Sequence, residues 1–152
     1  MILLLALLIG IVAGLRAMLA PAAVAFAARF GGLALAGTPL AFMGYAWTPW
    51  IFGIAALAEL VTDQLPSTPS RKIPVQFGTR IVTGALSGAC IGAAHGMLVG
   101  GLVAGILGAV VGTYGGAAAR GAMARSFTSD RPGALIEDVV AIVLAWIAVS
   151  MA

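Results

Sequence analysis

From residue 81 to residue 119 the sequence reads IVTGALSGACIGAAHGMLVGGLVAGILGAVVGTYGGAAA, and His95 is the only acidic or basic residue in this stretch. A helix crosses the hydrocarbon core of a bilayer with about 20 residues. The stretch is therefore too long for one membrane span and about right for two. We expect a hairpin of two membrane helices that turns near His95 and Gly96.

The composition of the whole chain points the same way. Hydrophobic residues make up 62% of the 152 positions, charged residues 9%, and the mean hydropathy is +1.12. About a quarter of the residues of a soluble domain are charged, and a soluble fold of this size could not bury so much apolar surface. We expect one integral membrane domain over residues 1–152, surrounded by the lipid bilayer.

Other partners and ligands have little support in the sequence. The net charge of +3 comes from scattered basic residues that form no stripe, so we expect no nucleic acid. Cys90 is the only cysteine and His95 the only histidine. We expect a packing role for Cys90, an interfacial place for His95, and neither a metal site nor a cofactor.

The order of apolar and polar segments predicts an all-α, polytopic transmembrane helix bundle with about five spans. The first span is interrupted by Arg16 and by Pro21, which a membrane helix tolerates as a kink. Segment 66–72 carries two prolines and two cations, and we interpret it as a loop rather than a site for a lipid phosphate. The expected spans cover residues 2–28, 46–65, 80–95, 98–119 and 134–151.

The distribution of basic residues predicts the orientation of these spans. Short cytoplasmic loops are enriched in lysine and arginine. With a cytoplasmic N-terminus, the five-span arrangement leaves only Arg29 of the loop-flanking basic residues outside. We therefore expect the C-terminus outside. The cytoplasmic residues would be Arg71, Lys72, Arg80, Arg120, Arg125 and Arg131.

Two parts of the chain share a loose pattern. Spaced glycines lead to an arginine in the first span and again before Arg120, and each pattern is followed by a span with acidic residues. This arrangement would fit two inverted two-helix repeats around a linking helix, as in many secondary transporters.

Glycines recur every four residues in the third and fourth expected spans. Residues four apart share one helix face, and small residues let membrane helices approach closely. We expect packing of these faces within one chain, with a homo-oligomer seam as the alternative. The packing glycines are Gly84, Gly88, Gly92, Gly96, Gly105, Gly108, Gly112 and Gly116.

Ionisable side chains inside the expected spans are the candidate site. Charges at membrane depth are costly, so each is a functional candidate. Arg16 lies near the middle of the first span, and a pair with Glu59 or Glu137 is geometrically feasible. Asp63 shares a helix face with Glu59. Two interpretations remain open, a transport or proton-relay site built from these four residues and a set of structural ion pairs.

Two segments resemble a known family. They are GLRAMLAP at residues 14–21 and AELVTDQLP at residues 58–66. The chain resembles small bacterial membrane proteins with domain of unknown function 4126, and residues 61–64 resemble a divergent subgroup, since many members have an aromatic stretch there. The resemblance implies a bacterial inner-membrane protein and implies no activity.

The functional expectation is a small transporter or channel-like protein for an ion or small solute. The alternative is a non-transporting membrane subunit or assembly partner of a larger complex. We expect no enzyme, because the sequence contains no phosphate-binding loop, metalloprotease motif or nucleophile elbow.

Overall fold

The computed structural model describes residues 1–65 and 73–152, and the expected loop at 66–72 lies outside this part. The described residues form helices and connecting turns without a β-strand, which confirms the all-α fold. The elements are α1 (Ile2–Leu15), α2 (Leu19–Phe26), a π-helical turn (Ala27–Gly31), a 3₁₀ turn (Ala41–Gly44), α3 (Thr48–Thr62), α4 (Pro74–Ala93), α5 (Leu98–Ser126) and α6 (Arg131–Ser150).

The expected first span is two helices separated by a break at Arg16. Arg16 has an extended backbone, with φ −139° and ψ 107°, and α2 begins three residues later at Leu19. Pro21 lies in the first turn of α2, where its missing N–H costs nothing. In a continuous helix the Pro21 ring would collide with the carbonyl of Ala17. The proline therefore favours a new helix start, where the sequence suggested only a kink.

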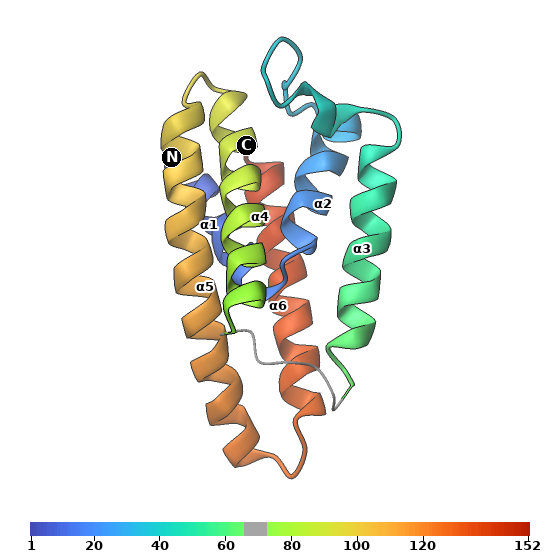
Figure 1. Cartoon of the computed structure of the whole chain (residues 1–152), viewed down its shortest axis with the longest axis vertical. Coiled ribbons are helices and arrows are strands. Elements are labelled where there is room, and N and C mark those ends of the chain that lie inside the picture. Colours follow the sequence, from blue (N-terminus) through green and yellow to red (C-terminus); the bar gives the residue numbers. More distant parts are fainter. Residues whose placement is uncertain (66–72) are drawn as a thin grey trace.

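After the break the chain reverses direction, so that α1 and α2 form a re-entrant hairpin whose tip lies inside the bundle (Figure 1). A side chain added at Gly14, near the end of α1, would meet α5 at Gly112, in the middle of that helix. At the far end of α2, the ring of Phe26 packs edge-on against Trp50 at the start of α3. Both half-helices therefore extend from the level of Arg16 toward the same end of the bundle.

The hairpin changes the expected arrangement of the chain ends. α3, α4, α5 and α6 alternate in direction, and α3 and α4 end well short of the turn that joins α5 to α6 (Figure 1). Both termini lie at the end of the bundle opposite that turn (Figure 1). Termini on opposite sides of a membrane would require them at opposite ends of the bundle, whereas the structure has both at one end, because residues 2–28 run in and back out rather than across. The expected inverted repeats also fail, since the counterpart of the broken first segment is the continuous helix α5.

Several helix boundaries differ from the expected ones, and three of the differences have a clear local reason. α4 begins at Pro74 rather than residue 80, because proline is favoured at the first position of a helix. α5 continues to Ser126 rather than residue 119, since Arg120 and Arg125 are good helix formers. α6 begins at Arg131, also with a proline in its first turn.

Glycines bring α1, α4 and α5 into close contact. A methyl group added to Gly88 in α4 would collide with the backbone of Gly101 and Gly105 in α5. On another face of α5, Gly108 and Gly112 lie against the backbone of α1. These glycine faces are thus filled within one chain. Gly96 instead forms the turn between α4 and α5 with φ 71°, and Gly116 is buried in α5.

The outside of the bundle is largely apolar. Two helices, Leu98–Ser126 and Arg131–Ser150, are long and apolar enough to cross a membrane, and three shorter helices are also apolar. Large hydrophobic side chains are exposed on α3, α5 and α6. They include Ile51, Ile54, Leu57, Val61, Val99, Val103, Leu107, Val111, Val139, Val143 and Trp146. The single cysteine, Cys90, is buried, whereas His95 is exposed in the α4–α5 turn.

Candidate functional site

The break at Arg16 exposes the end of α1 in the middle of the bundle. The last carbonyl groups of a helix have no partner within the helix and must be satisfied elsewhere. Arg80 of α4, whose side chain is only 3% exposed, donates from Nη1 to the carbonyls of Gly14 and Leu15, each at 2.8 Å. Its positive charge also complements the negative end of the α1 dipole.

The start of α2 is bound by a carboxylate, whose charge is opposite to that of Arg80. The amides of Ala17 and Met18 donate to the two carboxylate oxygens of Glu59, at 2.7 Å and 2.8 Å. A carboxylate at a helix N-terminus satisfies free N–H groups and interacts favourably with the helix dipole. Glu59 Oε1 also lies 4.0 Å from Nη2 of Arg80. One ion pair therefore joins the groups that bind the two sides of the break.

The side chain of Arg16 is completely buried and contacts two aspartates. Its guanidinium forms ion pairs with Asp63 at the end of α3 and with Asp138 in α6. Nε of Arg16 donates to Oδ1 of Asp138 at 2.6 Å, and Gln64 donates to Oδ2 of the same carboxylate at 3.1 Å. The break is thereby connected to α3 and α6 as well as to α4.

We call Arg16, Glu59, Asp63, Arg80 and Asp138 the break cluster. It contains one more carboxylate than guanidinium groups. The three carboxylate side chains are 12% to 14% exposed, so they are largely withdrawn from water. Charges in such a place persist only when they are paired and hydrogen-bonded.

A second cluster lies nearer the end of the bundle where α5 meets α6. Arg120 Nη2 is 2.9 Å from the carboxylate of Asp130, and Nη1 is 3.4 Å from that of Glu137. Arg120 also donates to the backbone carbonyl of Asp63 at 3.5 Å. Asp63 therefore contacts this cluster with its backbone and the break cluster with its side chain.

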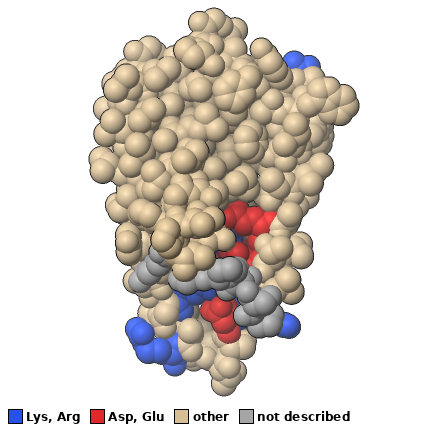
Figure 2. Space-filling model, in the orientation of Figure 1, with Lys and Arg blue, Asp and Glu red and all other residues tan. Residues whose placement is uncertain are grey.

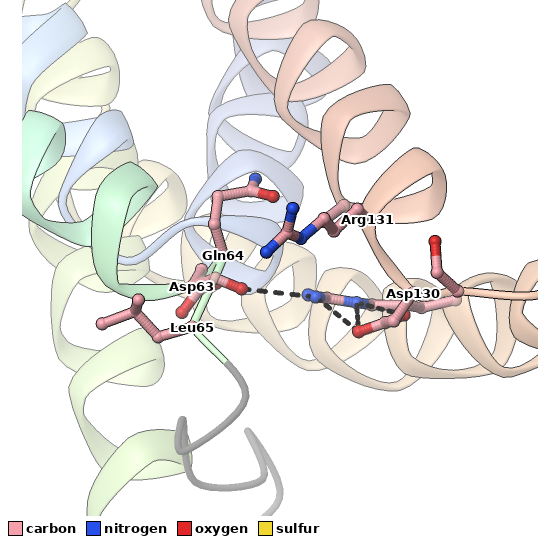
Figure 3. Close-up of a pocket in the computed structure, with 8 residues that line it drawn as sticks. Asp63, Gln64, Leu65, Asp130 and Arg131 are labelled. Carbon is pink, nitrogen blue, oxygen red and sulfur yellow. Dashed lines mark hydrogen bonds and ion pairs between the residues drawn. The ribbon is translucent and has the colours of Figure 1, made fainter.

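Two polar cavities adjoin these clusters. One, of about 490 Å³, is lined by the tip residues Ala17 and Met18, by Glu59 and Asp63, and by side chains of α4. Figure 2 shows acidic side chains in a recess in the lower half of the molecule, with basic side chains beside and below them and a mostly uncharged upper half. The other, of about 230 Å³, lies among the ends of α3 and α5 and the start of α6. Figure 3 shows Asp63 and Gln64 in this cavity, facing Asp130 and Arg131. Asp63 lines both cavities.

The four candidate residues are close in space but pair differently from the expected way. Arg16 binds Asp63 and Asp138 rather than Glu59 or Glu137. Glu59 binds backbone amides, and Glu137, 6% exposed, pairs with Arg120. The reason is the reversal at the break, which turns the amides rather than the Arg16 side chain toward Glu59.

Two residues of the break cluster were missed in the sequence. The sequence suggests that Arg80 lies at the cytoplasmic start of the third expected span, although Pro74 signals a helix start that puts Arg80 nearly two turns inside α4. Asp138 was passed over for its neighbour Glu137, which lies in line with the buried residues Ala134, Ala141 and Ala145. Consecutive helix residues point about 100° apart, so the two acids reach different arginines.

Fold and site together define a small helical bundle with a broken helix and buried ion pairs at its centre. The chain belongs to the family with domain of unknown function DUF4126, whose model matches residues 3–152, as the resemblance implied. No curated protein and no solved structure matches the chain. Within the described residues no group of three or more histidine, cysteine or acidic side chains could hold a metal ion.

Proposed function

We propose that this chain is a polytopic protein of the bacterial inner membrane, with α3 to α6 crossing the bilayer and α1–α2 entering and leaving from one side. The apolar side chains exposed on α3, α5 and α6 support this proposal, because lipid would cover them at low cost, whereas exposure to water would not be favourable. Non-helical backbone at membrane depth is tolerated where it is buried in protein, as it is at Arg16.

The orientation follows from the basic residues at the two ends. Arg125 and Arg131 lie where α5 ends and α6 begins, whereas Arg29 lies at the opposite end with both termini. Since short cytoplasmic loops collect basic residues, we place the α5–α6 turn in the cytoplasm. Both termini then lie outside.

Within this membrane protein, we assign the break cluster as the site of a small transporter or channel-like protein for an ion or small solute. The observation that carries the assignment is the broken helix, whose C-terminal carbonyls and N-terminal amides are bound by Arg80 and Glu59. Discontinuous helices with charged groups at their inner ends are a recurrent way of building transport sites at the bilayer midplane.

The two polar cavities support access to this site from the cytoplasmic half of the bundle. The smaller one lies among the ends of α3 and α5 and the start of α6, the larger one extends from the hairpin tip to the first turns of α4, and Asp63 lines both. The ion pair between Asp63 and Arg16 would then close the inner end of this access path. Because the break cluster has one excess carboxylate, a proton bound there would neutralise it, and protons are the first ion to test.

Purified protein in liposomes containing a pH-sensitive dye tests the proposal. With a potassium diffusion potential as the driving force, we expect wild-type protein to carry protons inward, and Glu59→Gln and Asp63→Asn to slow the flux at least tenfold. Ser126→Ala, at the exposed end of α5, is the matched control and should keep the wild-type rate. Circular dichroism and gel filtration would establish that each variant is folded.

A negative result would favour the alternative hypothesis, in which the protein does not transport. If folded wild-type protein moves neither protons nor sodium, potassium, chloride or acetate faster than empty liposomes leak, the buried ion pairs serve the fold. The chain would then be a non-transporting membrane subunit or assembly partner.

A further inference from the structure

α3 is the helix least embedded in the bundle. Within the part of the chain that the structure describes, Pro49 and Ala56 are its buried residues. α1, of similar length, has eight buried residues and is locked to α5 by glycine contacts. A helix with few buried apolar contacts separates from its neighbours at a lower free energy than one in a packed core.

Cavities flank α3 on two sides. Toward α4 lies the polar cavity of about 490 Å³, which Ala55, Glu59 and Thr62 help to line. Toward α6 lies an apolar groove of about 810 Å³, with α2 as its floor and Trp50 and Trp146 on its two walls. α3 can therefore shift sideways without displacing another helix.

The two ends of α3 are attached by different kinds of contact. Near its start, the ring of Trp50 packs edge-on against the ring of Phe26 in α2, with centroids 5.6 Å apart. Gly53 also faces the ring of Phe26. Near its end, Glu59 binds the amides of Ala17 and Met18 and lies 4.0 Å from Arg80. Asp63 pairs with Arg16 through its side chain and accepts a hydrogen bond from Arg120 at its backbone carbonyl. The first attachment is apolar and the second is ionic.

We infer that α3 is the moving helix of this protein, pivoting at Trp50 and Phe26 and released at its other end when Glu59 and Asp63 are neutralised. A bound proton or cation would weaken both ionic attachments and let the end of α3 move away from the hairpin tip. That movement enlarges the polar cavity. The role of this movement in transport rests on the proposed function, whereas the movement itself can be measured without a transport assay.

Distances between pairs of spin labels on the protein in nanodiscs test the movement. In a Cys90→Ala background, labels at Val61 and Val111 report the released end, and labels at Ile51 and Val99 report the pivot; all four side chains are exposed. We expect the Glu59→Gln/Asp63→Asn variant to shift the Val61–Val111 distances by several ångströms. The Ile51–Val99 distances should stay as in the parent protein.

Ser126→Ala is the control, because the Ser126 hydroxyl donates to the carbonyl of Ala122 within α5. It should leave both distances unchanged. Equal distances in parent and double variant would overturn the inference. So would a shift at both pairs, which would mean that α3 detaches as a whole, or a shift produced by Ser126→Ala.

Hydrogen exchange of the wild-type protein gives a second test that does not depend on any substitution. Amides of residues 54–62 in α3 should exchange at least tenfold faster than amides of residues 84–92 in α4. Equal protection of the two segments would contradict the inference. A positive result in both measurements without proton flux would leave α3 as a mobile helix in a protein that is not a transporter.

Discussion

Arg80 and Glu59 bind opposite sides of one helix break, the guanidinium on the carbonyls that end α1 and the carboxylate on the amides that begin α2. Each charge has the sign that the adjacent helix dipole favours. The two side chains are themselves 4.0 Å apart at their nearest charged atoms. The reversal of the chain at Arg16 is thus fixed from both sides by residues far away in the sequence.

Replacing Arg80 tests whether the break depends on it. Arg80→Met removes both donors from the carbonyls of Gly14 and Leu15 and leaves Glu59 with one cation fewer. Losing one partner of a buried charged group typically costs about 3–5 kcal/mol, so we expect a large loss of thermal stability in detergent. Arg125→Met, at the exposed end of α5, should change little. Equal melting temperatures for the two variants would show that the break is stable without Arg80.

The two neighbouring acids of α6 should couple differently to Arg16. Arg16 contacts Asp138, whereas Glu137 contacts Arg120. In a double-mutant cycle on thermal stability, Arg16→Met and Asp138→Asn should be non-additive by about 1–3 kcal/mol, as expected for residues in one network. The cycle of Arg16→Met with Glu137→Gln should be additive to within about 0.5 kcal/mol. A larger coupling of Arg16 to Glu137 than to Asp138 would mean that α6 is rotated about its axis from its orientation in this structure.

Much of the fold follows from local signals. The apolar stretch around His95 predicts the α4–α5 hairpin, and the glycines spaced by four predict that its helices pack closely. The reversal at Arg16 could not be read in the same way, because GLRAMLAP fits a kinked membrane helix as well as a broken one. What separates the two conformations is the presence of Arg80 and Glu59 on other helices, and no local pattern encodes that.

The same limit applies to the site. The free-energy cost of burying a charge identifies ionisable residues of the apolar spans as candidates, since each must be paired. The candidates found in this way are Arg16, Glu59, Asp63 and Glu137. Which acid meets which arginine depends on helix rotation and on the direction of α2. Both are set by tertiary packing. The pairing was therefore predicted incorrectly and Arg80 and Asp138 were missed, although Arg16, Glu59 and Asp63 do lie together in the break cluster.

Glycine substitutions should separate contact positions from open ones. A methyl group at Gly88 would lie 2.7 Å from Cα of Gly105, and one at Gly112 would lie 3.0 Å from Cα of Gly14. Gly88→Ala and Gly112→Ala should therefore lower the melting temperature markedly, because backbone cannot move aside as a flexible side chain can. At Gly78 and Gly115 nothing lies within 4 Å, and alanine there should be neutral or stabilising by up to about 1 kcal/mol. Equal effects at all four positions would contradict the tight packing of α1, α4 and α5.

The re-entrant hairpin makes a prediction about topology that differs from five full spans. If α1–α2 enters and leaves from one side, the N-terminus, residues 32–40 and the C-terminus all lie outside the cell. In a Cys90→Ala background, cysteines at Ala36 and at an added N-terminal tag should both react with a membrane-impermeant maleimide applied to intact spheroplasts.

A cysteine at Thr128, in the α5–α6 turn, should react with the same maleimide only after the membrane is opened. The control for access is the Ala36 site, which both arrangements place outside. Five full spans predict instead that the N-terminal tag is protected until lysis, because residues 2–28 would then carry the chain across the bilayer. Protection of the tag together with reaction at Ala36 would therefore show that α1 and α2 cross the membrane, and the hairpin would have to be abandoned.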